Sequence, residues 1–159
     1  MAFYYLDASA LVKSYHTEPG SIWVRQIVAA RSENNLPAHR IYIAEITIAE
    51  CAAAFSILTR TNKISRQVRD ANYKELVRDV LKTYRTIRVI RDDIDRAADL
   101  TQKHPLKGYD AIQLAVASRL KGLLSESEVA PVFVCADSTL VQAAQAEGLA
   151  VENPSDHNE

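Results

Sequence analysis

Four acidic residues stand at positions where a carboxylate can take part in chemistry. Asp7 and Asp137 each come at or just after the end of a short apolar run. Asp110 opens an apolar segment, and Glu50 lies among alanines. Carboxylates that gather in one place repel one another unless a cation balances them. Oxygen ligands select hard divalent ions, so a cluster of these acids would bind Mg²⁺ or Mn²⁺ and would suit metal-assisted hydrolysis of a phosphodiester bond.

Each of these acids also has an interpretation that involves no chemistry. Asp is a preferred residue at helix N-termini, so Asp7 and Asp137 can be helix caps. Asp110 can favour the positive end of its helix by ~0.3 to 1 kcal/mol, and Glu50 can lie on a solvated stripe. The residue types alone leave both interpretations open. The joint occurrence of four such acids favours the metal site.

The sequence contains no complete ligand set or nucleophile motif for another kind of chemistry. Its four histidines are scattered, and Cys51 and Cys135 form no CxxC pair and are expected to be buried. It has no GxSxG elbow, GxxxxGK[ST] loop or GxGxxG fingerprint. Aspartyl-phosphate chemistry ranks low, because residues 7–9 lack the second acid of a DxD pair. Three further acids are interpreted as surface residues: Glu45, Asp92 and Asp93.

The elements that must position the four acids follow from the apolar pattern. Short runs at residues 3–6, 40–43, 86–90 and 132–135 predict strands, with an edge strand at 149–151. Helical periodicity separates them and predicts an α/β fold, a three-layer α/β/α domain with a mostly parallel sheet. The carboxyl ends of parallel strands meet at one edge, where Asp7 and Asp137 would converge. Helices packed over that edge would bring Asp110 and Glu50 alongside them.

A strongly basic segment occupies residues 60–91, with ten basic and three acidic residues. Predicted helices at 44–58 and 65–84 form a hairpin there, and Val68, Leu76, Val77, Val80 and Leu81 are expected to face inward. The basic residues are either a solvated helix face with helical ion pairs or a footprint for a phosphate backbone. The candidates for RNA contact are Arg66, Arg69, Lys74 and Arg78.

Composition bounds the remaining possibilities. A chain of 159 residues with 48% hydrophobic and 25% charged residues suits one globular domain, which we place at residues 1–152. Residues 153–159 are expected to form a frayed polar tail. The N-terminus has no leader pattern and no window is long enough to span a membrane, so we expect a soluble cytoplasmic protein without a membrane partner.

Several segments, taken in order, make the chain resemble the PIN-domain nucleases, and in particular the VapC-like toxins of type II toxin-antitoxin systems. The resemblance covers nearly the whole chain. It rests on YLDASALVK at 5–13, EPGS at 18–21, IAECAAA at 48–54, YDAIQLA at 109–115 and FVCAD at 133–137. It implies that Asp7, Glu50, Asp110 and Asp137 form the catalytic, metal-binding set.

The resemblance also implies an endoribonuclease that depends on Mg²⁺ or Mn²⁺, acts as a homodimer and is neutralised by a cognate antitoxin whose tail enters the acidic site. Ser9 resembles the hydroxyl residue that supports the first Asp. Cys135 stands where the family often has Thr or Ser, and Ser138 is the candidate that compensates for it. The alternative function is that of a catalytically weak PIN-like protein that acts mainly by binding a protein partner.

Overall fold

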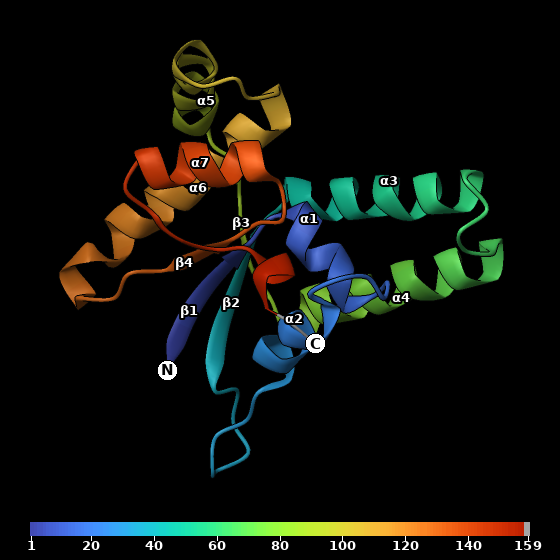
Figure 1. Ribbon diagram of the computed structural model, residues 1–159. Helices are drawn as coiled ribbons and strands as arrows, with labels where there is room; N and C mark the ends of the chain where they lie inside the picture. The colour runs from blue at the N-terminus through green and yellow to red at the C-terminus, as the bar shows by residue number, and fades with distance from the viewer. Residues whose placement is uncertain (158–159) are drawn as a thin grey trace.

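A parallel sheet of five strands forms the centre of the molecule (Figure 1). The structure, a computed structural model, describes residues 1–157. The strand order is β3-β2-β1-β4-β5, and every neighbouring pair is parallel, so the predicted three-layer fold is confirmed. The strands are β1 (Ala2–Leu6), β2 (His39–Ala44), β3 (Arg85–Ile87), β4 (Val132–Val134) and β5 (Ala150–Glu152).

Helices cover both faces of this sheet, because alternate residues of each strand are buried on opposite sides. Tyr5 and Phe133 pack in one core with α5, α6 and α7. Leu6 and Val134, the next residues along, pack in the other core with α1 to α4. The helical elements are α1 (Ala8–Leu11), η1 (Val12–Ser14), α2 (Ser21–Ala29), α3 (Ile46–Arg60), α4 (Arg66–Lys82), α5 (Arg91–Lys103), α6 (Gly108–Leu124), η2 (Ser125–Ser127), α7 (Ser138–Ala146) and η3 (Pro154–Asp156).

Acidic residues begin the helices that follow two neighbouring strands. Asp7 caps α1 by accepting a hydrogen bond from the amide of Ala10 at 2.9 Å, and Asp137 caps α7 by accepting one from Leu140 at 2.9 Å. The capping interpretation of both acids is therefore confirmed. Leu6 pairs with Val134 across β1 and β4, so the two capping residues lie at the same edge of the sheet.

Some predicted boundaries are wrong. The strand predicted at 86–90 is the shorter β3, because the chain turns away after Ile87 and the amide of Val89 donates to the carboxylate of Glu45 at 2.8 Å. The helix predicted from residue 44 begins at Ile46, since β2 continues through Ala44. The segment directly after Asp7 forms the single turn α1, followed by the 3₁₀ turn η1.

The expectation that five apolar residues of α4 face inward is right for Leu76 and Val80, which pack in or against the core, and wrong for the other three. Leu76 is buried, whereas Val68, Val77 and Leu81 are exposed, Leu81 by 80%. The hairpin of α3 and α4 projects from the sheet (Figure 1), so only one side of α4 meets other elements. Tyr73, Val77 and Leu81 recur every four residues and form an exposed apolar stripe.

Asp93 is likewise not a surface residue. Its side chain is 2% exposed, and it accepts two hydrogen bonds from the guanidinium of Arg119 at 2.8 Å each. It also accepts a hydrogen bond from the amide of Ile90 at the start of α5, at 3.0 Å. This ion pair joins α5 to α6 on one face of the sheet and holds the pKa of Asp93 below its usual value.

The predicted frayed tail is folded as far as His157. Pro154 is buried, and the side chain of Asn153 accepts a hydrogen bond from the amide of Ser155 at 2.9 Å. The ring of His157 stacks on Trp23 with the centroids 4.0 Å apart. Residues 158–159 lie outside the described part of the chain. No helix within residues 1–157 has the length and apolar character needed to cross a membrane.

Candidate active site

Asp7 is the most rigidly held of the four acids. It follows β1, is 4% exposed, and accepts hydrogen bonds from the amide of Ala10 and from the hydroxyl of Ser9, the latter at 2.8 and 3.0 Å. Burial raises the pKa of Asp7 to about 6, although these hydrogen bonds favour the ionised form. The charge of Asp110 raises it further. The fold thus holds a carboxylate at a position that disfavours its negative charge.

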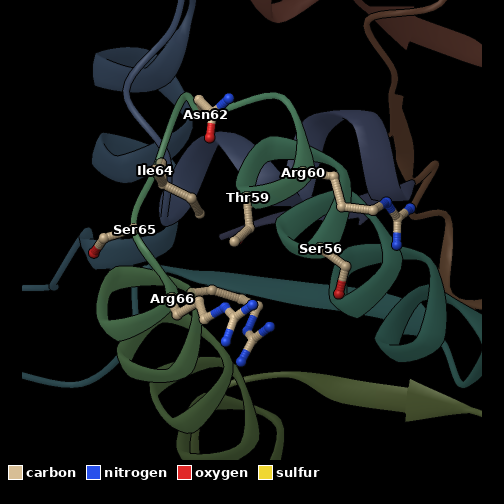
Figure 2. Close-up of a pocket in the computed structure, with 8 residues that line it drawn as sticks. Ser56, Thr59, Arg60, Asn62, Ile64, Ser65 and Arg66 are labelled. Atoms are coloured by element: carbon tan, nitrogen blue, oxygen red, sulfur yellow. The ribbon is translucent and has the colours of Figure 1, made fainter.

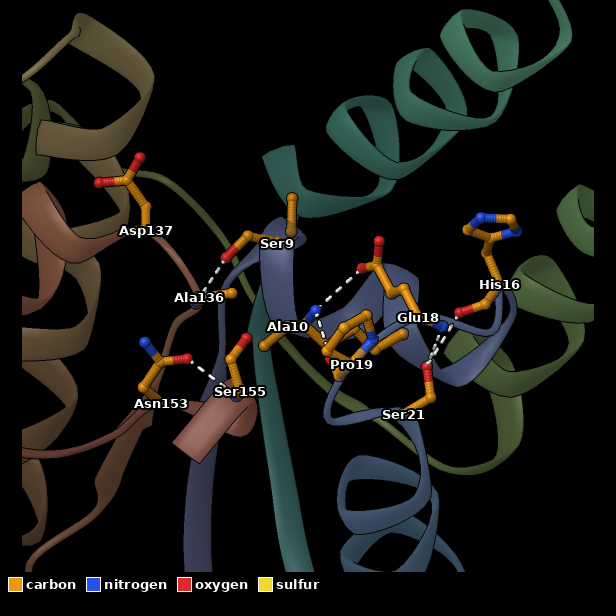
Figure 3. A network of polar contacts seen from close by, with 12 residues as sticks. Ser9, Ala10, His16, Glu18, Pro19, Ser21, Ala136, Asp137, Asn153 and Ser155 are labelled. Atoms are coloured by element: carbon orange, nitrogen blue, oxygen red, sulfur yellow. Dashed lines mark hydrogen bonds and ion pairs between the residues drawn. The ribbon is translucent and has the colours of Figure 1, made fainter. Parts of the chain in front are cut away.

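Ser9 connects the ends of the two central strands. Its hydroxyl donates to Asp7 and accepts a hydrogen bond from the amide of Ala136 at 2.9 Å (Figure 3). It also lies 3.7 Å from the sulfur of Cys135. One side chain therefore fixes the carboxylate after β1 relative to the backbone after β4.

Glu50 and Asp110 reach the same region from helices. Glu50, on α3, accepts a hydrogen bond from the amide nitrogen of Gln113 at 2.7 Å. Burial raises the pKa of Glu50 to about 7, and the charges of Asp7 and Asp110 add to the effect. Burial also raises the pKa of Asp110, in the first turn of α6, and the charge of Asp137 contributes. Asp7, Glu50 and Asp110 are thus mutually repulsive, and Asp137 is joined to them through Asp110.

Asp137 is exposed at the start of α7. Of the two residues expected to support it, Cys135 contacts it and Ser138 does not. The sulfur of Cys135 accepts a hydrogen bond from the amide of Asp137 at 3.3 Å, so the residue that replaces Thr or Ser still contacts the last acid. Ser138 is exposed and, within the described residues, forms no hydrogen bond to Asp137. The structure therefore does not bring Ser138 to the acid, whereas it does bring Ser9 and Cys135 to this edge of the sheet.

An open cleft of about 500 Å³ lies at this edge. Glu50, Asp137 and Ser9 line it, together with Lys13 and Ser155. None of the four acids forms an ion pair with a basic residue in the part of the chain that the structure describes. The charge of Lys107 favours the ionised form of Asp110 without forming an ion pair with it. A group of carboxylates with so little positive charge beside it offers the oxygen ligands that a hard divalent cation prefers. Within residues 1–157, however, no three His, Cys, Asp or Glu side chains already converge as a closed ligand set.

Two residues of this region escape the sequence interpretation. Lys13 is buried, and its ammonium group donates to the carboxylate of Glu18 at 3.0 Å and to the carbonyl of Pro19 at 2.8 Å. These bonds hold the loop before α2 beside the cleft, which Lys13 and Glu18 both line. Gln113 lies within a largely apolar stretch of α6 and contacts Glu50. Both residues lie in segments that carry the family resemblance, YLDASALVK and YDAIQLA, and that was the available signal.

The hairpin tip forms a second concave surface, with a volume of about 500 Å³, where α3 joins α4 (Figure 2). Arg66 and Arg69, two of the four predicted RNA contacts, line it, and so does Arg60, which that set omitted. Arg78 lies farther along α4, and its guanidinium is paired with Glu75 at 3.0 Å and with Asp79 at 3.2 Å. Lys74 is exposed on α4. The basic residues of the hairpin therefore fall into two groups: arginines that line the pocket at the tip, and Arg78 farther along α4, whose charge is balanced by two carboxylates.

Comparison with known proteins identifies the fold family. The sequence matches the PIN domain over residues 4–127. The chain belongs to the PIN domain family. PIN domains are generally nucleases and typically use divalent metal ions, which places the chain among hydrolases that act on nucleic acids. No curated protein sequence matches the chain.

Several solved structures are similar to this PIN domain over nearly its whole length. The crystal structure of FitAcB from Neisseria gonorrhoeae is 15% identical with a TM-score of 0.60, covering 94% of this chain and 96% of that one. VapBC2 from Rickettsia felis, bound to a DNA fragment from its promoter, is 15% identical with a TM-score of 0.60, covering 95% and 98%. PAE2754 from Pyrobaculum aerophilum is 17% identical with a TM-score of 0.60, covering 98% and 91%. At these identities the likeness establishes the fold.

Proposed function

We propose that this PIN domain is an endoribonuclease that depends on Mg²⁺ or Mn²⁺ and serves as the toxin of a type II toxin-antitoxin pair. One observation carries the proposal. Carboxylates from distant parts of the chain lie close enough at the carboxyl edge of the sheet for the charges of Asp7 and Asp110 to act on Glu50, and none of the four acids forms an ion pair with a basic residue among the described residues. A divalent cation would balance that charge.

Asp7, Glu50, Asp110 and Asp137 are the residues that would hold the cation. When bound, the ion lowers the pKa of a bound water and neutralises charge on the phosphate that is attacked. The protein's part is placement. Ser9 keeps the Asp7 carboxylate oriented, and the buried β1 gives it a rigid mount. The open cleft that Glu50 and Asp137 line would admit an RNA backbone to that edge.

The hairpin tip is proposed as a contact for RNA phosphates away from the reacting bond. Arg60 and Arg66 form no ion pair within the described residues, so both guanidinium groups are available to an anion. Arg69 shares its charge with Asp70 at 2.8 Å and contributes less. Lys74 extends the surface, and Arg78 is the weakest candidate because two carboxylates already hold it.

A cognate antitoxin and a second copy of the chain are the proposed protein partners, and the cytoplasm is the proposed location. The support for an antitoxin is the likeness to FitAcB and VapBC2, and also to a toxin-antitoxin complex from Klebsiella pneumoniae, which is 16% identical with a TM-score of 0.55 over 95% of this chain and 97% of that one. The exposed stripe of Tyr73, Val77 and Leu81 supports a protein contact on α4.

The decisive experiment measures cleavage of a structured RNA by the purified protein with Mn²⁺ and with EDTA. We expect cleavage only with the metal, and a loss on the order of 100-fold or more in Asp7→Asn, because one preorganised charge at the reacting centre is removed. Asp99→Asn, an exposed acid of α5, is the matched control and should cleave like the wild type. Cleavage that persists unchanged in Asp7→Asn would overturn the proposed site.

A further inference from the structure

A buried polar network lies next to the acids. The hydroxyl of Tyr5 donates to the amide oxygen of Gln113 at 2.6 Å. The amide nitrogen of Gln113 donates to the hydroxyl of Thr47 at 2.8 Å and to the Oε1 oxygen of Glu50 at 2.7 Å. Gln113 is 1% exposed, and Tyr5 and Thr47 are equally enclosed. The Gln113 amide thus uses both of its donor hydrogens and one of its two acceptor lone pairs within the protein.

Each member of the network comes from an element that carries one of the acids or directly precedes it. Tyr5 lies on β1, two residues before Asp7, which follows the strand as the cap of α1. Thr47 lies three residues before Glu50 on α3, and Gln113 lies three residues after Asp110 on α6, which is the spacing of neighbours on a helix surface. The network therefore links β1, α3 and α6, the three elements that position Asp7, Glu50 and Asp110.

The hydrogen bonds also fix which way the Gln113 amide points. The hydroxyl of Tyr5 donates to the amide oxygen at 2.6 Å, and a hydroxyl donor requires an oxygen rather than an NH₂ group on that side of the amide. With the oxygen turned to Tyr5, both amide hydrogens face Thr47 and Glu50. A rotation of the amide by half a turn would set its oxygen against the Glu50 carboxylate and leave buried groups unpaired, which is unfavourable.

We propose that Gln113 is a positioning residue that holds the Glu50 carboxylate in the orientation required for the divalent cation. Its hydrogen bond engages Oε1, and no hydrogen bond within the described residues engages the other oxygen, which leaves Oε2 for the metal. Tyr5 acts one step farther away by fixing the amide. This role rests on the proposed function, since it assigns the network to the same metal site.

A purely structural role would make a different prediction from a positioning role. If the network only tied three elements together, its loss would lower stability and would affect the metal no more than any other core defect. If Gln113 acts through Glu50, its loss weakens the metal site, and it has no further effect once the Glu50 charge is gone. Residues that share one hydrogen-bond network are non-additive in this way.

The test measures Mn²⁺ affinity by electron paramagnetic resonance of the free ion, with thermal melting of each variant in parallel. We expect Gln113→Met to bind Mn²⁺ about 10- to 100-fold more weakly, as for other residues that orient a metal ligand. The double variant Glu50→Gln with Gln113→Met should bind like Glu50→Gln alone. Leu100→Ala, a core truncation on α5, is the stability control and should melt earlier with unchanged affinity.

Tyr5→Phe keeps the proposal testable if Gln113→Met does not fold. The phenyl ring preserves the stacking on Phe133, with centroids 5.6 Å apart, and removes only the hydroxyl that orients the amide. We expect a loss of several-fold in Mn²⁺ affinity, within the range for residues that orient a ligand. Wild-type affinity in the folded variants, or additive losses in the double variant, would overturn the positioning role.

Failure of this proposal can be told apart from failure of the proposed function. Asp7→Asn is included in the same titration. If the wild type binds Mn²⁺, Asp7→Asn does not, and Gln113→Met binds normally, the metal site stands and the role of Gln113 alone is wrong. If the wild type does not bind Mn²⁺, both proposals are wrong.

Discussion

Asp7 destabilises the metal-free fold when it is ionised, because the folded protein removes its carboxylate from water. Its pKa is about 6 in the folded chain, against an ordinary value of 3.8. The folded state therefore holds the proton more tightly than the unfolded state. Stability from this group is fully present below about pH 4 and is lost as the pH rises towards 6. Glu50, with a pKa of about 7, changes stability in the same direction.

Replacement of Asp7 by Asn should therefore stabilise the metal-free protein at pH 8. The gain is at most about 3 kcal/mol, since each unit of pKa shift corresponds to about 1.4 kcal/mol. Asn keeps an oxygen that can accept the capping hydrogen bond from Ala10. Urea unfolding in EDTA at pH 8 and pH 4 measures the effect, which should vanish at the lower pH.

The same variant gives an internal control through the metal. Saturating Mn²⁺ should stabilise the wild type and leave Asp7→Asn almost unchanged, because a ligand stabilises only the state that binds it. The order of stability at pH 8 should then reverse. Asp99→Asn should follow the wild type in both conditions. Destabilisation of Asp7→Asn in EDTA at pH 8 would contradict this account of the buried charge.

At the scale of elements, the hairpin of α3 and α4 tests whether the basic segment binds RNA or only faces solvent. Arg60→Ala with Arg66→Ala should weaken binding to single-stranded RNA regardless of its sequence. Each lost phosphate contact should reduce the slope of log affinity against log salt by about 0.7. Fluorescence anisotropy over a salt series measures both quantities, with a nuclease-inactive Asp7→Asn background to keep the RNA intact.

Arg78→Ala is the matched control for this pair of substitutions. It removes one positive charge from the same helix, but that charge is already shared between Glu75 and Asp79. We expect affinity and salt slope close to those of the unsubstituted protein. Equal losses in Arg78→Ala and in the double variant would show that general charge, rather than the tip surface, attracts RNA.

The elements also show how far sequence patterns reach. Apolar runs that end near acids are local signals, and they correctly predicted the central strands and the caps at Asp7 and Asp137. The burial of Asp93 depends on Arg119, which is 26 residues away on another helix. The outward face of α4 depends on what the hairpin packs against. Such outcomes are set by tertiary contacts, which periodicity within one element does not contain.

The candidate site follows the same division: its local signals could be read from the sequence, and its tertiary contacts could not. Apolar runs ending near acids pointed to the edge of the sheet that Asp7 and Asp137 share, and residue-type similarity suggested Glu50 and Asp110. The support for Glu50 was not predictable, because Gln113 reaches it only when α3 and α6 pack together. The predicted support of Asp137 by Ser138 is absent because it was inferred from sequence adjacency alone. Adjacency in sequence does not make its hydroxyl face Asp137 once α7 has begun.

At the scale of the whole molecule, the last described residues pack against the start of α2, near the N-terminal end of the chain. Pro154 packs on Gly20, which has the left-handed φ of 85° before α2. A methyl group at Gly20 would lie 2.4 Å from the carbonyl oxygen of Pro154. Ser155, in the same turn, lines the acidic cleft. The C-terminal turn therefore links the stability of the chain ends to the shape of the cleft.

Gly20→Ala should consequently lower stability and detach the C-terminal turn. The left-handed conformation alone costs an L-residue about 1 to 2 kcal/mol, and the contact with Pro154 adds to that cost. Gly122→Ala is the matched control, because among residues 1–157 a methyl group there meets no atom within 4 Å outside the backbone of its own helix, and helix propensity favours alanine by about 1 kcal/mol. Thermal melting should therefore shift down for Gly20→Ala and stay level or rise for Gly122→Ala.

Trp23 fluorescence reports whether the turn has moved, since the His157 ring is stacked on the indole in the folded chain. Gly20→Ala should change the emission of Trp23 in the native state, and deletion of residues 153–159 should give the same spectrum. A large loss of stability with a wild-type spectrum would mean that strain at Gly20 is absorbed by the loop before α2. The cleft beside Glu50 and Asp137 would then be independent of the chain end.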